Sequence, residues 1–338
     1  MPTVMLGLSL WSALTDATNA VQSAEVDRLV VQLGASKFAD REAATKRLEA
    51  MGQPAWIAIA RAAEKTRDPE IRRRLEGIRG RDGRSVLELA TAQRRSRAFI
   101  KGRVTYDGEP PSRPDLKPLV ERSADRIHCL KGDTRDPLWI VSPQRGVANV
   151  VVWLRPSNAT HFDVPADLRS RNDVVLIGQP LATFEPHVVA INPSTWDAET
   201  KRQRPTGQLF KALNNSPINH NVHCGGNSLL NPTKNVIIPP NLDVAFSAKP
   251  CRDRDSGREE LLSIGCDMHR WMSAKVAVFD HPYYAVTDAN GNFEIAHAPT
   301  DMELMIAVWH ESFGTLRQAR MEGIRLKPGE NRKDLKIK

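Results

Sequence analysis

The sequence predicts a mainly β protein in which a β-sandwich follows a small helical domain. Apolar residues recur at helical spacing from residue 24 to about residue 80. From residue 98 onward they occur instead in short alternating or β-branched runs separated by turn residues, a pattern that is typical of a sandwich. The chain is therefore expected to divide into a helical domain at 24–80, a polar and basic linker at 81–97, and a β domain at 98–338.

The composition is that of a globular chain with an uneven basic surplus. Apolar residues make up 41% of the 338 residues, enough to fill a core in each of two domains, and the formal charge is +8. Between Arg61 and Arg97 basic residues outnumber acidic ones twelve to six. Because no aromatic residues interleave with these charges as they do in nucleic-acid binders, we expect solvated helix faces and no nucleic-acid partner.

The first residues resemble a signal peptide in part. Val4 to Leu14 has the length of an apolar signal-peptide core, and the small residues Thr18 and Ala20 follow it, but no basic residues precede it. Either the true start lies upstream of Met1 or the stretch is a first helix. We expect a signal peptide within residues 1–23, and hence a periplasmic or secreted protein. No apolar run reaches the roughly 18 residues that a membrane span requires.

Helix start and stop signals divide residues 24–80. Asp40 and Asp68 are placed to cap helices, and Gly52 is placed to end one. Two helix pairs that begin near Phe38 and Asp68 look like HEAT-type repeats, although two units are fewer than an independent solenoid needs. The helical domain is therefore expected either to cap the sandwich or to dock a partner.

Residues 98–338 are expected to supply the strands of the sandwich. Asn290-Gly291 between two alternating runs is a hairpin signal, and residues 192–206 interrupt the strands with a polar insert. The other expected strands are 99–106, 146–154, 174–177, 187–191, 209–213, 235–238, 242–246, 261–264, 275–279 and 303–309.

One stretch places three kinds of metal ligand at three-residue steps. Cys266, His269 and Met272 supply a thiol, an imidazole and a thioether, and His220 lies 46 residues upstream beside Asn221. Two His and one Cys with a weak axial Met are the ligands of blue-copper electron-transfer sites. Zinc would take the Cys and His but has little use for Met. Singly each residue is more often a core or surface residue, but their joint spacing favours copper on a loop between two strands.

Other donors leave alternatives open. His223 and Cys224 form a second imidazole–thiol pair close to His220, so a different or larger metal cluster is an alternative. His187 and His310 are expected to support strands rather than to bind metal.

The remaining cysteines do not fix the redox compartment. If Cys266 is a ligand, Cys129, Cys224 and Cys251 remain, which is an odd number. One disulfide between Cys224 and Cys251 would leave Cys129 free, but sequence alone does not determine the pairing.

On these residues the chain resembles the cupredoxin family, and its ligand loop is similar to the short loop of amicyanin-like members. His-Asn at residue 220 and Cys-x-x-His-x-x-Met at residue 266 carry the likeness. With Val150 to Leu154, Phe184 to Val188 and Trp309-His310-Glu311, the chain looks like bacterial proteins labelled methylamine-utilization proteins. The helices are similar to those attached to such domains in planctomycetes, and residues 285–295 resemble an element of carboxypeptidase-regulatory-like β-domains.

The resemblance implies a Greek-key cupredoxin-like sandwich with a type-1 copper site. It places His220, Cys266 and His269 in a trigonal plane with Met272 axial, and it gives Asn221 a stiffening role through hydrogen bonds. It also implies that His269 approaches the surface as the electron port, flanked by Met268 and Trp271 as an apolar docking patch.

The leading hypothesis is therefore an electron carrier that exchanges electrons with a redox partner protein and is not an enzyme. One alternative is a non-enzymatic binding or docking module with a structural or absent metal. A copper-dependent enzyme with an open coordination position is a third reading, and an axial Met272 that closes the site argues against it.

Overall fold

A computed structural model describes residues 25–51, 55–79, 83, 85–88, 97–158, 161–181, 183–197, 200–250 and 259–338. The chain forms two compact units, one of Met1–Arg97 with Pro165–Ser170 and one of Ala98–Val164 with Arg171–Lys338. The expected signal peptide, Cys251 and most of the expected linker lie outside the described residues. No helix in the described ranges is long and apolar enough to cross a membrane.

The first unit is helical. Residues 25–32 form a helix, and α2 (Phe38–Met51), α3 (Trp56–Lys65) and α4 (Pro69–Gly77) follow. Asp68 caps α4 as expected, because its carboxylate accepts hydrogen bonds from the Glu70 and Ile71 backbone N–H groups at 2.8 and 3.1 Å. The cap predicted at Asp40 is wrong: α2 begins at Phe38, so Asp40 lies within its first turn. Gly52 lies outside the described residues.

A shared core joins these helices. Its buried members come from the helix at 25–32 and from α2, α3 and α4, and they include Leu29, Leu48, Ile59 and Leu75. Val86, which follows α4, packs into the same core. The returning segment 165–170 is held by a bidentate ion pair between Arg97 and Asp167, at 2.7 and 2.8 Å.

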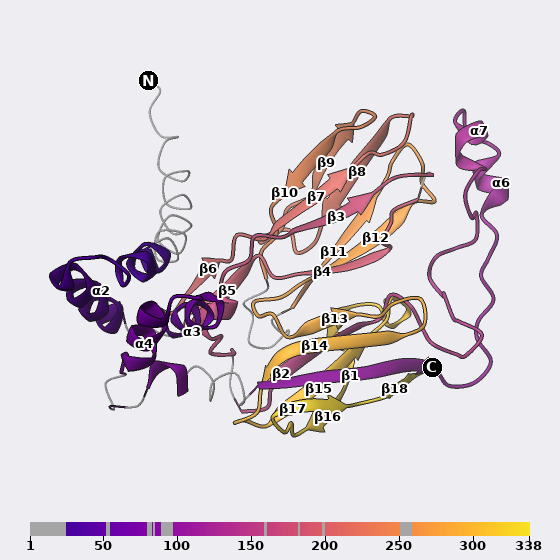
Figure 1. Ribbon diagram of the computed structural model, residues 1–338. Helices are drawn as coiled ribbons and strands as arrows, with labels where there is room; N and C mark the ends of the chain where they lie inside the picture. The colour runs from indigo at the N-terminus through magenta and orange to yellow at the C-terminus, as the bar shows by residue number, and fades with distance from the viewer. Residues whose placement is uncertain are drawn as a thin grey trace. The chain divides into compact units, whose positions relative to one another are not determined.

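The second unit is built mainly of β-sheets, which confirms the mainly β class (Figure 1). A five-stranded sheet has the order β4-β12-β11-β8-β9, and a three-stranded sheet has the order β10-β7-β3. Their apolar side chains form one core, so these two sheets pack as a sandwich. The strands are β3 (Val174–Gly178), β4 (Val188–Ile191), β7 (Leu209–Leu213), β8 (His220–Gly225), β9 (Lys234–Ile238), β10 (Asp243–Phe246), β11 (Glu260–Gly265) and β12 (Ser273–Val278).

Two further four-stranded sheets belong to the same unit. One has the order β13-β2-β15-β16, and the other has the order β14-β1-β17 with β18 also paired to β1. Their strands are β1 (Arg97–Tyr106), β2 (Val151–Pro156), β13 (Tyr284–Val286), β14 (Asn292–Pro299), β15 (Leu304–Trp309), β16 (Arg320–Ile324), β17 (Gly329–Arg332) and β18 (Leu335–Ile337).

Strand β4 and the second half of β12 are covered on both faces, which explains why residues 188–191 and 276–278 are continuously apolar. In β12, Val276 and Val278 enter the core of the sandwich. Ala277, which points the other way, and Phe279 just beyond the strand pack against Trp153 and Trp309 of the sheet that contains β2 and β15. The predicted ligand loop connects β11 and β12, two inner strands of this sheet, so each end of the loop joins a strand that is paired on both sides.

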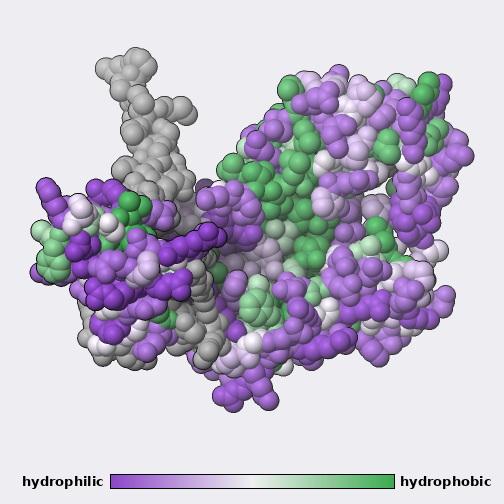
Figure 2. Space-filling view, in the orientation of Figure 1, coloured by the Kyte–Doolittle hydropathy of each residue, from purple (hydrophilic) through white to green (hydrophobic). Residues whose placement is uncertain are grey.

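The outer face of sheet β10-β7-β3 is exposed. Val174, Leu176 and Leu209 are 49%, 41% and 49% exposed. Figure 2 shows the apolar side chains gathered over this sheet. These exposed residues alternate along β3 and β7 with buried Ile177, Phe210 and Ala212, because successive side chains of a strand point to opposite faces.

Two predicted features differ from the structure. The polar insert at 192–206 is a hairpin of β5 (Ser194–Asp197) and β6 (Arg202–Pro205). Asn290-Gly291 does form a turn, with Gly291 at a φ of +80°. The strands on its two sides, β13 and β14, nevertheless join different sheets instead of forming one hairpin.

Candidate metal centre

The predicted ligand loop connects two paired strands. β11 and β12 are antiparallel, with Gly265 opposite Ser273, so Cys266 to Met272 form the connection. The Met272 backbone N–H donates to the His269 carbonyl at 2.8 Å, which closes a turn within the loop. The placement of this loop between two strands of a sandwich agrees with the prediction.

Three donor atoms from two parts of the chain, this loop and the start of β8, meet at the loop. Cys266 Sγ lies 3.8 Å from His220 Nδ1 and 3.7 Å from His269 Nδ1, and the two Nδ1 atoms are 3.1 Å apart. His220 is the first residue of β8, which pairs with β11. The side chains of His220, Cys266 and His269 are 0%, 3% and 1% exposed. They are the one such group of His, Cys, Asp or Glu residues found within the described ranges.

These separations fit one shared metal ion. Donors about 2.0 to 2.3 Å from an ion at trigonal angles lie about 3.5 to 3.8 Å apart. The two sulfur–nitrogen distances fall at this range and the nitrogen–nitrogen distance is slightly shorter. His220 Nε2 is buried and has no hydrogen-bond partner among the described residues. The polar contacts of this imidazole therefore lie on its Nδ1 side.

Burial sets the protonation of two of the donors. It lowers the pKa of His220 to about 4, with the neighbouring His269 imidazole acting in the same direction. His220 is thus neutral near pH 7 and has a lone pair to offer a metal. Burial also raises the pKa of the Cys266 thiol. A bound metal would have to displace this proton, as metals do from coordinating thiols.

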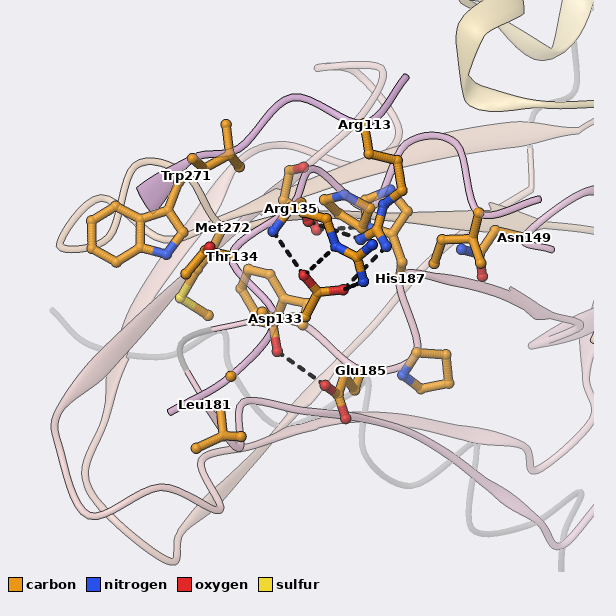
Figure 3. A pocket seen from close by; sticks show the side chains of 18 of the residues that line it. Arg113, Asp133, Thr134, Arg135, Asn149, Leu181, Glu185, His187, Trp271 and Met272 are labelled. Carbon is orange, nitrogen blue, oxygen red and sulfur yellow. Dashed lines mark hydrogen bonds and ion pairs between the residues drawn. The ribbon is translucent and has the colours of Figure 1, made fainter. Parts of the chain in front are cut away.

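Met272, the expected axial ligand, is buried in the same core as Cys266. Together with Trp271 it lines one side of a cavity of about 680 Å³ (Figure 3). Leu116, Val120 and Cys129 also line this cavity.

The polar end of the cavity is an ion-pair cluster. Asp133 lies between Arg113 and Arg135, with nitrogen–oxygen distances of 3.1 and 2.8 Å (Figure 3). The hydrogen bond from Arg135 holds the pKa of Asp133 well below its usual range. The cluster combines two guanidinium groups with one carboxylate, so its formal charge is +1.

Asn221 ties the two halves of the centre together. Its Oδ1 accepts hydrogen bonds from the Asp267 and Met268 backbone N–H groups at 2.8 and 3.2 Å, and Cys266 Sγ lies 3.2 Å from the same oxygen. Its Nδ2 donates to Asn235 and Asp267. The structure thus gives Asn221 hydrogen bonds of the kind that the resemblance implies.

The second imidazole–thiol pair does not join the donor group. His223 is 46% exposed and its Nδ1 lies 3.1 Å from Asp267 Oδ1. Cys224 is a free thiol that packs into the sandwich core, and burial raises its pKa to about 11. The described part of the structure therefore does not contain the Cys224–Cys251 disulfide that was considered from the sequence. His223 and Cys224 are adjacent in β8, so their side chains point to opposite faces of the sheet. They therefore cannot both bind a metal ion held by His220.

The expected supporting histidines lie outside the donor group as well. His187 Nδ1 is 3.0 Å from the Ser273 carbonyl and its Nε2 is 2.7 Å from Glu311. His310 Nε2 lies 2.9 Å from the Leu138 carbonyl.

His269 was expected to approach the surface, but the structure buries it. Its side chain is 1% exposed, and its Nε2 lies 3.1 Å from Asp125 Oδ2. Asp125 belongs to a segment, with α6 (Lys117–Val120) and α7 (Arg126–Cys129), in which we predicted no element. The sequence offered one indication that this segment lies near the metal centre. The adjacent potential ligands His128 and Cys129 occur there in a stretch with no strand pattern. The role of His269 as an electron port stays a prediction.

Comparisons with known proteins give only slight likenesses. No protein-family model matches the chain, and no curated protein sequence does. Among solved structures, the chain is similar to a purple cupredoxin from Nitrosopumilus maritimus, with 13% identity over 31% of this chain and 99% of that one, at a TM-score of 0.22.

Two other solved structures are similar at the same level. An amicyanin variant in its Cu(I) state has 11% identity over 37% of this chain and 98% of that one, at a TM-score of 0.24. A copper-containing nitrite reductase from Thermus scotoductus has 13% identity over 31% of this chain and 22% of that one, at 0.22. Because these TM-scores are low, the metal assignment rests on the donor geometry.

Proposed function

We propose that this protein is a copper-binding electron carrier with a type-1 site. His220, Cys266 and His269 would hold the ion, and the Met272 thioether would be a weaker fourth ligand. The observation that carries the proposal is the convergence of two imidazole Nδ1 atoms and one thiol in a buried site. Two His, one Cys and a Met are the donor set of blue-copper electron-transfer sites.

Copper bound to such a set supplies one-electron redox chemistry. The chain supplies a rigid frame for it. β11, β12 and β8 fix both ends of the ligand loop, and Asn221 holds the loop backbone between Cys266 and Met268. A protein frame that changes little between two oxidation states of the metal suits electron transfer. Electron transfer of this kind involves no substrate. We therefore propose a carrier and not an enzyme, serving a redox partner protein.

The wider setting follows from the same proposal. A periplasmic or secreted location would suit a copper protein of this kind. We also propose that the sandwich has Greek-key cupredoxin connectivity and that the helical unit is HEAT-like and serves in docking.

The test is addition of Cu(II) to the purified metal-free protein. We expect an intense blue absorption band and a blue-copper electron paramagnetic resonance spectrum, and we expect Cys266→Ser to abolish both because the thiolate is the source of the colour. Cys224→Ser is the matched control, since this buried thiol packs into the same core but does not reach the donor group.

Two outcomes would reject the proposal in different ways. A wild-type protein that stays colourless with Cu(II) rules out the carrier and favours a docking module with a structural or absent metal. Blue colour that survives in Cys266→Ser rules out the ligand assignment instead. Tight binding of Zn(II) with no blue copper form would indicate a structural zinc site.

A further inference from the structure

The segment that contains α6 and α7 covers the metal centre. Asp125, immediately before α7, places Oδ2 3.1 Å from His269 Nε2. This imidazole edge faces away from the Sγ and Nδ1 donors, and in the described structure it is buried rather than open to water. Figure 1 shows α6 and α7 beside the ends of β11 and β12, where the ligand loop lies.

Several contacts fix the segment in this position. Cys129 and Val120 are buried in the sandwich core that also contains Cys266 and Met272. His128 Nε2 lies 3.0 Å from the Pro180 carbonyl. A segment anchored on both sides of Asp125 holds the carboxylate against His269 with little freedom.

The backbone around Asp125 is held as well. The Asp125 N–H donates to Ser123 Oγ at 3.1 Å, and its carbonyl accepts from the His128 and Cys129 N–H groups at 3.0 and 3.1 Å. The side chain of Asp125 is 36% exposed, whereas that of His269 is 1% exposed. Water can therefore solvate one edge of the carboxylate while the other edge meets the imidazole.

The contact determines which nitrogen of His269 carries its proton. A carboxylate accepts hydrogen bonds, so Nε2 must be the protonated nitrogen that donates to it. Nδ1 is then left with its lone pair directed toward Cys266 and His220, where a metal would bind. The contact thus prepares His269 as a ligand before any metal arrives.

We propose that Asp125 is a positioning residue of the metal centre, acting through the His269 imidazole. Its copper-related consequences rest on the proposed function, whereas the contact itself does not. A carboxylate bonded to a ligating imidazole fixes the orientation of the ring and raises its basicity. Its negative charge also favours the more positively charged oxidised ion, so it lowers the reduction potential.

The first experiment measures copper binding and potential. Loss of an outer partner of a ligand typically costs 10–100-fold in metal affinity. We expect Asp125→Ala to weaken copper binding by about 10-fold or more in chelator competition, to change the electron paramagnetic resonance spectrum and to raise the reduction potential. Asp125→Asn removes the charge with little change in shape and is expected to raise the potential too. Asp125→Glu keeps the charge and is expected to restore part of the affinity.

Glu121→Gln is the matched control. It makes the same change of charge on the same segment, at a residue 53% exposed that pairs only with Lys117 at 3.8 Å among the described residues. We expect it to leave affinity, spectrum and potential unchanged. Wild-type values in both Asp125→Ala and Asp125→Asn would overturn the proposal, and so would equal effects of Glu121→Gln.

The second experiment uses the metal-free protein, so it separates this proposal from the proposed function. Long-range ¹⁵N–¹H NMR of the histidine side chains reports which nitrogen carries the proton. We expect His269 to be protonated at Nε2 in the wild type and to become a mixture of tautomers in Asp125→Ala. A wild-type His269 protonated at Nδ1, or no change in Asp125→Ala, would overturn the proposal even if the protein binds copper. The expected shift would stand even if the metal were not copper.

Discussion

At the scale of single residues, Asn221 links the strand that carries His220 to the loop that carries Cys266. One amide oxygen receives two backbone N–H groups of the loop and the Cys266 sulfur. We expect Asn221→Ala to leave these donors unsatisfied and to loosen the loop, lowering copper affinity about 10–100-fold in chelator competition. Asn235→Ala is the control, because Asn235 forms hydrogen bonds with Asn221 and Asp267 but with none of the proposed metal ligands. An affinity equal to wild type in Asn221→Ala would contradict this role.

His310 makes stability depend on pH away from the metal centre. The Ser312 N–H donates to its Nδ1 at 3.3 Å, its Nε2 lies 2.9 Å from the Leu138 carbonyl, and its ring stacks on Trp139. These contacts suit the neutral ring, and burial lowers the pKa of His310 to about 4. The unfolded chain, with a His pKa of about 6.5, therefore binds this proton more readily than the folded chain.

The stabilisation is complete above about pH 6.5 and is lost as pH falls toward about 4. The loss amounts to at most about 3 kcal/mol of the free energy of unfolding. We expect urea unfolding at about pH 7.5 and about pH 5 to show a larger drop for the wild type than for His310→Gln. His220, whose pKa is lowered in the same way, contributes equally to both proteins. Equal drops in both would show that His310 is not responsible.

At the scale of elements, short-range patterns were sufficient for the strands and for the ligand loop. Alternation and β-branched runs predicted β3, β4, β7, β9, β10, β11 and β12 to within a few residues, because burial of one or both faces leaves a local signal. The spacing of Cys266 and His269, with His220 beside Asn221, also predicted correctly that these three residues lie together. These parts of the site could be predicted because a loop between paired strands has limited reach.

Other parts depended on long-range packing. α6 and α7 are each too short for a helical period to appear, so Asp125 could not be connected with His269 from the sequence. The turn at Gly291 was recognised, but the separation of β13 and β14 into different sheets depends on partners at β2 and β1, far away in the chain. Exposed β16 and β17 have no buried face to produce a pattern.

Strand β1 contains a close approach that can be tested. β1 pairs first with β17 and then with β18, and the chain crosses beside Gly102. A Cβ at Gly102 would lie 1.8 Å from the Lys333 carbonyl oxygen. We expect Gly102→Ala to destabilise the protein by about 1–3 kcal/mol in thermal unfolding.

Gly323 on β16 is the control for this substitution. A Cβ at Gly323 would meet no heavy atom within 4 Å beyond its chain neighbours. Gly323→Ala is therefore expected to change stability by no more than about 0.5 kcal/mol. Similar losses in both variants would rule out the close approach at Gly102 as the cause.

At the scale of the whole molecule, the two compact units have separate cores and different secondary structure. All of the proposed copper ligands belong to the β unit. A ligand stabilises the state that binds it, by about 4 kcal/mol when its free concentration is 1,000 times the dissociation constant. Copper is therefore expected to stabilise the β unit specifically.

Calorimetry with and without copper tests this expectation. We expect the transition of the β unit to rise by several degrees with copper, and the loss of the helical circular dichroism signal, which reports on the helical unit, to keep its midpoint. Cys266→Ser should remove the copper-dependent rise, and Cys224→Ser should retain it. Because the helical unit contributes no donor to the group, a copper-dependent rise of the helical transition alone would place the metal outside the proposed site.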